Sequence, residues 1–330
     1  MEPKRLLLVF IFLLCLFQIN AFAEENRLIT VQIPAPSLQN NLVGEALNQL
    51  LVIALPPSYY SSDQCYPVVY FLHGFGESPH NVGLFARLAD SLYEENQLNE
   101  MIIVGVNGTN RLGGSFYVNS PVTGNWEDFV VNDVIGYLDQ NYRTLPQSSS
   151  RGIAGFSMGG FAAINLAFRH PGVFSVVYSL APGLFDENGL PQAMTTWDQR
   201  FRNAYGAAFS PNPNLPYPHS EIPVLDNSAD DNRIKANWEN GFGNLEQKIA
   251  DYLCRGITLK SIRIEVGERD YYKWIINGCL YFSQLLTEQG IPHELNRFSG
   301  GHTLTSSLIE KNILPYFSQQ LERMNSITNN

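Results

Sequence analysis

The chain has 330 residues, a formal net charge of −10 at pH 7 and 45% hydrophobic residues. An acidic surface repels phosphate backbones and anionic lipid head groups, which argues against a nucleic-acid-binding or membrane-surface protein. The length allows one large domain or two small ones and is ample for a substantial hydrophobic core.

Residues 1–23 are predicted to be an export signal. Lys4 and Arg5 precede an apolar run from Leu6 to Phe17, and Ala21-Phe22-Ala23 has the pattern that a signal peptidase accepts. A membrane anchor is the less favoured alternative, because this run falls short of the roughly 20 residues that a spanning helix needs. We therefore expect a secreted or periplasmic mature protein of residues 24–330, with a charge of −11 and no stable membrane insertion.

Short apolar runs alternate with amphipathic stretches along the mature chain, which predicts βαβ units and a mostly parallel sheet. The pattern predicts strands at Leu28–Ile33, Leu50–Leu55, Val68–Leu72, Met101–Val106, Gly152–Gly155, Ser175–Leu180, Ile262–Val266 and Glu294–Phe298. Helices are predicted at about 80–96, 127–141, 158–169, 272–289 and 304–322. The absence of repeats and low-complexity linkers favours a single α/β domain over 24–330.

A segment at about 182–242 interrupts this alternation after the sixth strand. Its stretch from Pro211 to Pro223 contains five prolines, and the segment is rich in aromatic residues. Loops of this length are often functional. Its aromatic side chains either line a substrate pocket beneath a cap or form a small core of the insertion itself, and the sequence does not decide between these: Trp197, Phe201, Tyr205, Phe209, Tyr217, Trp238 and Phe242.

Gly155-Phe156-Ser157-Met158-Gly159 is a GxSxG motif between the predicted strand 152–155 and the predicted helix 158–169. A nucleophile elbow needs this strand–turn–helix setting, because its sharp turn exposes the serine hydroxyl at the edge of the sheet. The alternative, an ordinary serine at a helix N-terminus, is less favoured in this context. Ser157 is therefore the candidate nucleophile.

A serine hydroxyl needs a base, and with such an elbow the acid and then the histidine follow along the chain. His302 lies in a glycine-containing loop after the last strand and is preferred over His293, which precedes that strand. Asp270 follows the strand 262–266 and is the expected acid, with Glu268 as the alternative. The acid would hold the imidazole in the correct tautomer.

Acyl transfer also needs donors for the developing oxyanion. We expect one to be the amide of Met158, just after the nucleophile. The strand 68–72 runs into His73-Gly74-Phe75-Gly76, so the amide of Phe75 is the second candidate, and His73 is expected to shape this loop rather than to take part in catalysis.

Neither a cofactor nor a metal is expected, since no CxxC motif or Cys/His cluster is present. Three cysteines remain after residue 23: Cys65, Cys254 and Cys279. Export would permit one disulfide among them, but the sequence does not identify the pair.

Together these segments resemble the esterase D family of α/β-hydrolases, which includes feruloyl and acetylxylan esterases and S-formylglutathione hydrolases. The resemblance extends over most of the mature chain. It is carried by the segments Leu55-Pro56-Pro57-Ser58-Tyr59, Tyr66–Gly74, Ser115-Phe116-Tyr117, Tyr142-Arg143-Thr144, Arg151–Gly160, Gly290–Glu294 and Gly300-Gly301-His302. It implies an α/β-hydrolase fold, with Ser157, Asp270 and His302 as the triad and Phe75 and Met158 as oxyanion donors.

We therefore expect a serine esterase that acts through an acyl-enzyme on a small-molecule or polysaccharide-linked ester, or on a lipid ester. Two alternatives remain: an acyltransferase with the same triad, and a catalytically silent binding protein. The oligomeric state is left open by the sequence.

Overall fold

The computed structural model describes residues 27–226 and 228–323, so the predicted signal peptide lies outside the described residues. Within these two ranges, no helix combines the length and apolar character needed to cross a bilayer. The apolar side chains of the sheet and of the helices around it belong to one continuous buried cluster.

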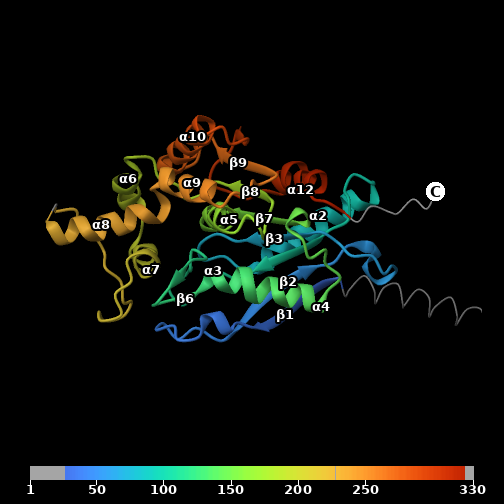
Figure 1. Cartoon of the computed structure of the whole chain (residues 1–330), viewed down its shortest axis with the longest axis horizontal. Coiled ribbons are helices and arrows are strands. Elements are labelled where there is room, and N and C mark those ends of the chain that lie inside the picture. The colour runs from blue at the N-terminus through green and yellow to red at the C-terminus, as the bar shows by residue number, and fades with distance from the viewer. Residues whose placement is uncertain (1–26, 227, 324–330) are drawn as a thin grey trace, which may run out of the picture.

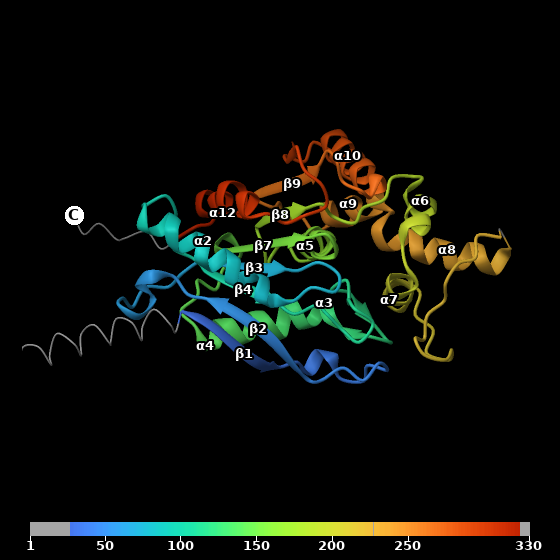
Figure 2. The same ribbon diagram turned by 180° about the vertical axis from the view of Figure 1, so that it is seen from behind.

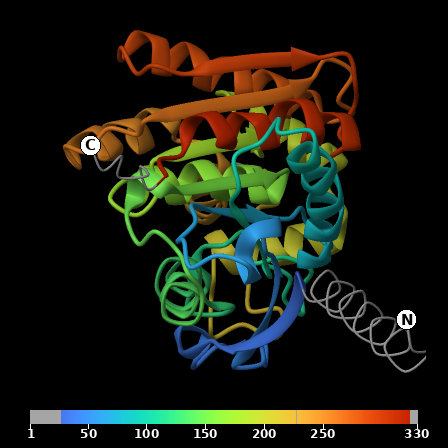
Figure 3. The same ribbon diagram turned by 90° about the vertical axis from the view of Figure 1, so that its right-hand side faces the viewer.

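The core is an eight-stranded sheet in the order β1-β2-β4-β3-β7-β8-β9-β10. Strand β2 pairs antiparallel with β1 and with β4, and every other pair is parallel. Figure 3 shows the sheet from the blue strands at one edge to the orange-red β10 at the other. The strands are β1 (Leu28–Pro34), β2 (Asn48–Ala54), β3 (Val68–Leu72), β4 (Ile102–Val106), β7 (Arg151–Phe156), β8 (Val176–Leu180), β9 (Ser261–Gly267) and β10 (Glu294–Phe298).

The central strands β3, β4, β7 and β8 are buried along their whole length. Parallel strands covered by helices on both faces have this uninterrupted apolar pattern. The predicted α/β class and mostly parallel sheet are therefore confirmed. A short hairpin of β5 (Asn119–Ser120) and β6 (Gly124–Asn125) was not predicted.

Helices cover both faces of the sheet. In Figure 1, α4 and α5 lie in front of it, whereas α2 and α12 lie in front in the reverse view of Figure 2. The helices are α2 (Val82–Glu94), α3 (Trp126–Asp128), α4 (Ile135–Asn141), α5 (Met158–Arg169), α6 (Gly189–Thr196), α7 (Gln199–Phe209), α8 (Ala229–Phe242), α9 (Leu245–Cys254), α10 (Lys273–Glu288), α11 (Ser306–Leu308) and α12 (Leu314–Gln320). A π-helical stretch (129–134) joins α3 to α4, and another (309–313) joins α11 to α12.

Segment 182–242 contains three helices, α6, α7 and α8, and extends from one end of the sheet (Figure 1). Part of its aromatic set forms an internal core, since the Tyr205 hydroxyl donates to the Trp238 carbonyl at 2.8 Å and both residues are fully buried. Other members, Trp197, Phe201 and Phe242, line a cavity that is described below. The aromatic side chains of the segment therefore pack against one another and also line a cavity.

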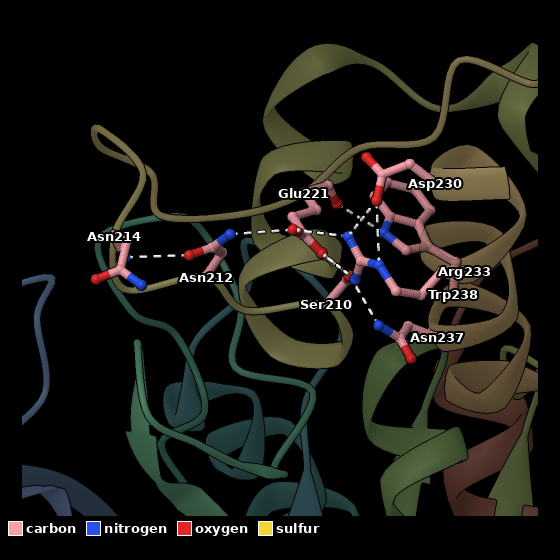
Figure 4. A network of polar contacts seen from close by, with 8 residues as sticks. All are labelled: Ser210, Asn212, Asn214, Glu221, Asp230, Arg233, Asn237 and Trp238. Atoms are coloured by element: carbon pink, nitrogen blue, oxygen red, sulfur yellow. Dashed lines mark hydrogen bonds and ion pairs between the residues drawn. The ribbon is translucent and has the colours of Figure 1, made fainter. Parts of the chain in front are cut away.

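A polar network ties the proline-rich loop of this segment to α8 (Figure 4). The Arg233 guanidinium donates to both carboxylate oxygens of Glu221, at 2.8 and 3.0 Å, and also to Asp230. The Trp238 indole donates to the Glu221 carbonyl at 2.9 Å, and the Asn212 amide donates to the Glu221 carboxylate at 3.0 Å. Hydrogen bonding to Arg233 lowers the pKa of Glu221, so this carboxyl group is ionised at neutral pH.

Candidate active site

Ser157 occupies the sharp turn between β7 and α5. Its backbone has φ 56° and ψ −114°, a region that non-glycine residues rarely adopt and that costs on the order of 1–3 kcal/mol. The flanking glycines are required by close backbone contacts. A Cβ atom on Gly155 would lie 1.9 Å from the Gly159 carbonyl oxygen, and one on Gly159 would lie 2.0 Å from the Leu72 carbonyl oxygen. The GxSxG motif thus has a steric explanation in this fold.

Three distant segments place a serine, a histidine and an aspartate in one hydrogen-bonded row. The Oγ atom of Ser157 lies 2.9 Å from Nε2 of His302, and Nδ1 of His302 lies 2.7 Å from Oδ2 of Asp270. Asp270 is completely buried, and its Oδ1 atom accepts a hydrogen bond from the Tyr272 amide at 2.8 Å. This second bond fixes the carboxylate plane, so the row has the geometry of a nucleophile, a base and an orienting acid.

The two alternatives that the sequence offered lie elsewhere. Glu268 is exposed and pairs with Arg297 at 3.6 Å. The Nε2 atom of His293 lies 2.6 Å from the Ser283 hydroxyl, and its Nδ1 atom lies 2.9 Å from the Ile291 carbonyl. Neither residue contacts Ser157.

The loop after β3 presents a free amide beside Ser157. The amide of Gly74 donates to the Glu77 carboxylate at 3.0 Å, and that of Gly76 donates to the Gly113 carbonyl at 2.9 Å. Between them, the Phe75 amide has no acceptor within the described part of the chain. Met158 is the first residue of α5, so its amide has no partner four residues back in the helix. Both residues line the cavity in front of Ser157.

His73 stabilises this loop through two hydrogen bonds of its ring. Its Nε2 atom accepts a hydrogen bond from the Gly108 amide at 3.0 Å, so Nδ1 carries the proton and donates to the Gly74 carbonyl at 2.8 Å. Burial lowers the pKa of His73, which keeps the ring neutral at neutral pH. The geometry matches the supporting role expected from the sequence.

A cavity of about 340 Å³ lies in front of Ser157 and His302. Segment 182–242 forms one wall of it with Trp197, Phe201 and Phe242. Among the described residues that line the cavity, the carboxylates are those of Glu77 and Asp198, and no lysine or arginine is present. The Arg200 guanidinium, which is not among the lining residues, lies over the Phe75 ring at 5.5 Å from its centroid. The aromatic lining consists of Phe75, Phe156, Trp197, Phe201, Phe242, Tyr272 and Trp274.

Sequence reasoning missed two aromatic contacts of the imidazole. The Tyr272 ring meets His302 edge to face with centroids 5.1 Å apart, and the Phe156 ring lies 5.0 Å away on a tilted plane. Tyr272 follows Asp270 by two residues, and Phe156 precedes Ser157. Their proximity to these two residues in the sequence was the available signal.

The structure offers no clear metal site in its described ranges, where no group of three or more His, Cys, Asp or Glu side chains is arranged to hold an ion. Cys65, Cys254 and Cys279 are all free thiols. Burial raises the pKa of the Cys279 thiol well above its usual range, so this cysteine stays protonated.

Known proteins resemble this chain in sequence and in fold. A Mycobacterium tuberculosis protein named an esterase is 25% identical over 276 residues, which cover 76% of this chain and 51% of the relative. The chain thus spans about half the length of this relative. A solved ferulic acid esterase superposes with a TM-score of 0.61 at 21% identity, covering 89% of this chain and 98% of the other.

An S-formylglutathione hydrolase from Staphylococcus aureus gives the same TM-score at 14% identity, with the same two coverages. At these identities the structural matches establish the fold, and the expected α/β-hydrolase fold is confirmed. Residues 47–306, which include the whole Ser157–His302–Asp270 row, match the family described as "Putative esterase". The chain belongs to that family.

Proposed function

We propose that the protein is a serine carboxylic-ester hydrolase whose nucleophile is Ser157. The observation that carries this proposal is the 2.9 Å contact between the Ser157 hydroxyl, held in a strained backbone conformation, and the His302 imidazole. Family membership and the named esterases among the relatives support the same reaction class.

In the first half of the reaction, His302 Nε2 accepts the Ser157 proton while Oγ attacks the ester carbonyl carbon. The amides of Phe75 and Met158 donate to the resulting oxyanion, each contributing about 3 kcal/mol to its stabilisation. Asp270 keeps the proton of the imidazole on Nδ1 and stabilises the imidazolium. Collapse of the intermediate breaks the ester C–O bond, and His302 returns its proton to the leaving alcohol.

In the second half, water replaces the alcohol. His302 accepts one proton from water as the oxygen attacks the acyl-enzyme carbonyl, and the same two amides hold the second oxyanion. Collapse of this intermediate breaks the bond between the acyl carbon and Ser157 Oγ. His302 returns its proton to Oγ, which releases the carboxylic acid and restores the Ser157 hydroxyl. No cofactor takes part in either half.

The cavity favours an uncharged ester with an apolar or aromatic group. Its aromatic rings can pack against a flat or extended group. The carboxylates of Glu77 and Asp198 would repel an anionic substrate. Feruloyl esters fit this description better than thioesters of glutathione, which carry two carboxylates.

Replacement of the serine tests the proposal. Ser157→Ala should lower kcat for p-nitrophenyl acetate at least about 1,000-fold without changing the melting temperature. Ser283→Ala is a matched control, because the Ser283 hydroxyl also contacts a histidine, His293 at 2.6 Å, and neither residue lines the cavity. Most activity remaining in Ser157→Ala would contradict the assignment.

Two further measurements separate the alternatives. An added alcohol that diverts the acyl group into a new ester, in preference to water, would identify an acyltransferase. A fluorophosphonate probe that leaves the protein unlabelled would identify a silent binding protein. Export remains a proposal based on residues 1–23, and sequencing the mature N-terminus, expected at Glu24, would test it.

A further inference from the structure

A second cavity of about 340 Å³ lies on the far side of the nucleophile helix. It is a groove between one face of α5 and one face of α9, closed at one end by the C-terminus of α8. Aromatic rings separate it from the catalytic cavity. Phe161 lines the second cavity and Phe242 lines the catalytic one, with ring centroids 4.8 Å apart.

The floor of this groove is apolar. Phe161, Ile164 and Phe168 follow each other at helical spacing along α5 and all face the groove. The Phe168 ring stacks on Tyr252 of α9 with centroids 4.3 Å apart, which joins the two walls. An alkyl chain or a small ring would find continuous apolar contact here.

The acidic side chains around the groove already have partners. Glu127 accepts hydrogen bonds from Arg169 at 2.8 Å and from His170 at 2.7 Å, and these contacts lower its pKa despite its burial. Asp251 is exposed and accepts a hydrogen bond from Gln247 at 2.8 Å. Arg255 adds a further exposed positive charge at the rim.

Lys248 of α9 is the one basic group at this cavity that is half-buried and has only carbonyl partners. Its ammonium donates to the carbonyls of Asn240 and Gly243, and no carboxylate of the described residues lies within 4.0 Å of it. An ammonium group has three hydrogens, so one remains for a ligand. Burial lowers the pKa of Lys248 to about 8, and a bound anion would compensate this cost.

We propose that this groove is a second, non-catalytic site that binds small amphipathic monocarboxylates. The apolar part of the ligand lies against Phe161, Ile164 and Phe168, and its carboxylate accepts a hydrogen bond from Lys248. The competing explanation is that Lys248 only caps α8, since both of its carbonyl partners lie at the C-terminal end of that helix.

Calorimetric titration of the full protein with octanoate and with 1-octanol separates these explanations. Lys248→Gln retains a donor for the two carbonyls but loses the charge. We expect saturable octanoate binding that weakens at least tenfold in Lys248→Gln, while 1-octanol binding stays the same. Lys260→Gln, at an exposed position outside the groove, is the matched control and should bind octanoate as the wild type does.

A second pair of variants locates the bound octanoate. Asn165→Trp narrows the groove and should abolish binding, whereas Thr196→Trp narrows the catalytic cavity and should leave binding unchanged. The proposal is overturned if the wild type shows no saturable binding, if Lys248→Gln binds octanoate unchanged, or if Thr196→Trp is the variant that loses binding.

Discussion

Replacing Asp270 by asparagine should remove the base function of His302 without disturbing the fold. In the wild type, Oδ1 of Asp270 accepts from the Tyr272 amide at 2.8 Å and Oδ2 accepts from Nδ1 of His302 at 2.7 Å. In Asp270→Asn the carbonyl oxygen must still face the Tyr272 amide. The new NH₂ group therefore points at the imidazole and donates to Nδ1.

An imidazole that accepts a hydrogen bond at Nδ1 carries its proton on Nε2. That proton faces the Ser157 hydroxyl, only 2.9 Å away, so the ring cannot act as a base in this tautomer. A loss of this kind lowers kcat about 1,000- to 10,000-fold, which corresponds to about 4 to 5.5 kcal/mol of transition-state stabilisation. Because the change is isosteric, stability should fall much less than activity.

The assay is steady-state hydrolysis of p-nitrophenyl acetate, with urea unfolding of the same samples. Glu268→Gln is the matched control, since it removes one negative charge from the same loop at an exposed position, and it should keep near-wild-type kcat. The reasoning is refuted if Asp270→Asn retains more than a tenth of wild-type kcat, or if Glu268→Gln lowers kcat equally.

Three further predictions concern packing, a buried carboxyl group and substrate charge. Gly159→Ala places a Cβ atom 2.0 Å from a backbone carbonyl oxygen and should lower the free energy of unfolding in urea by more than about 3 kcal/mol. In Gly136→Ala the added Cβ atom meets no atom within 4 Å, so this free energy should rise by about 0.5–1 kcal/mol. Equal effects of the two changes would argue against the elbow contact. Burial raises the pKa of Glu265, which is 1% exposed with Oε2 unpaired, so its ionisation destabilises the fold as pH rises. In denaturant unfolding, Glu265→Gln should therefore be more stable than the wild type by about 1–3 kcal/mol at pH 8, and this difference should vanish near pH 4. A stability difference that does not depend on pH would contradict this. Asp198→Asn keeps the N-cap hydrogen bond from the Phe201 amide but removes a negative charge from the cavity. The kcat/KM for the anionic p-nitrophenyl hemisuccinate should therefore rise about three- to tenfold relative to that for p-nitrophenyl butyrate. An unchanged ratio would exclude this charge effect.

The sheet could be predicted well because its strands carry strong local signals. The runs at 68–72 and 294–298 match β3 and β10 in both bounds, and the other predicted strands differ by one or two residues at one or both ends. Buried parallel strands are continuous apolar segments, which a single sequence displays directly. The order of GxSxG, Asp270 and His302 along the chain also allowed the site to be placed at one sheet edge.

The helices of segment 182–242 could not be predicted, because their local signals are mixed. Helix α8 contains Asn232, Asn237 and Asn240 and shows no strong apolar stripe, and its stability comes from buried Trp238 and Phe242 and from the contacts of Arg233. Helix α9 was also missed. Tertiary packing, which determines α8, has no counterpart in a local pattern. Helix α9 does have one, since Leu245, Ile249 and Tyr252 recur at helical spacing and are all buried, and this signal was overlooked.

The contacts between side chains across the site were not predicted from the sequence either. The edge-to-face contact of the Tyr272 ring with His302 and the hydrogen bond from the Gly74 amide to the Glu77 carboxylate both depend on loop conformation rather than on residue type. The choice of Asp270 over Glu268 came from position relative to a strand end. In the structure Glu268 is exposed and lies 3.6 Å from Arg297 of β10, whereas Asp270 is buried against His302.

The central claim is that Ser157 carries the acyl group during turnover. Rapid acid quenching during hydrolysis of p-nitrophenyl acetate, followed by peptide mapping with mass spectrometry, measures this directly. We predict an acetyl group on Ser157 that is absent in Ser157→Ala and accumulates when deacylation is slow. Acetylation of a different residue, with Ser157 unmodified while p-nitrophenol is released at the wild-type rate, would contradict the account.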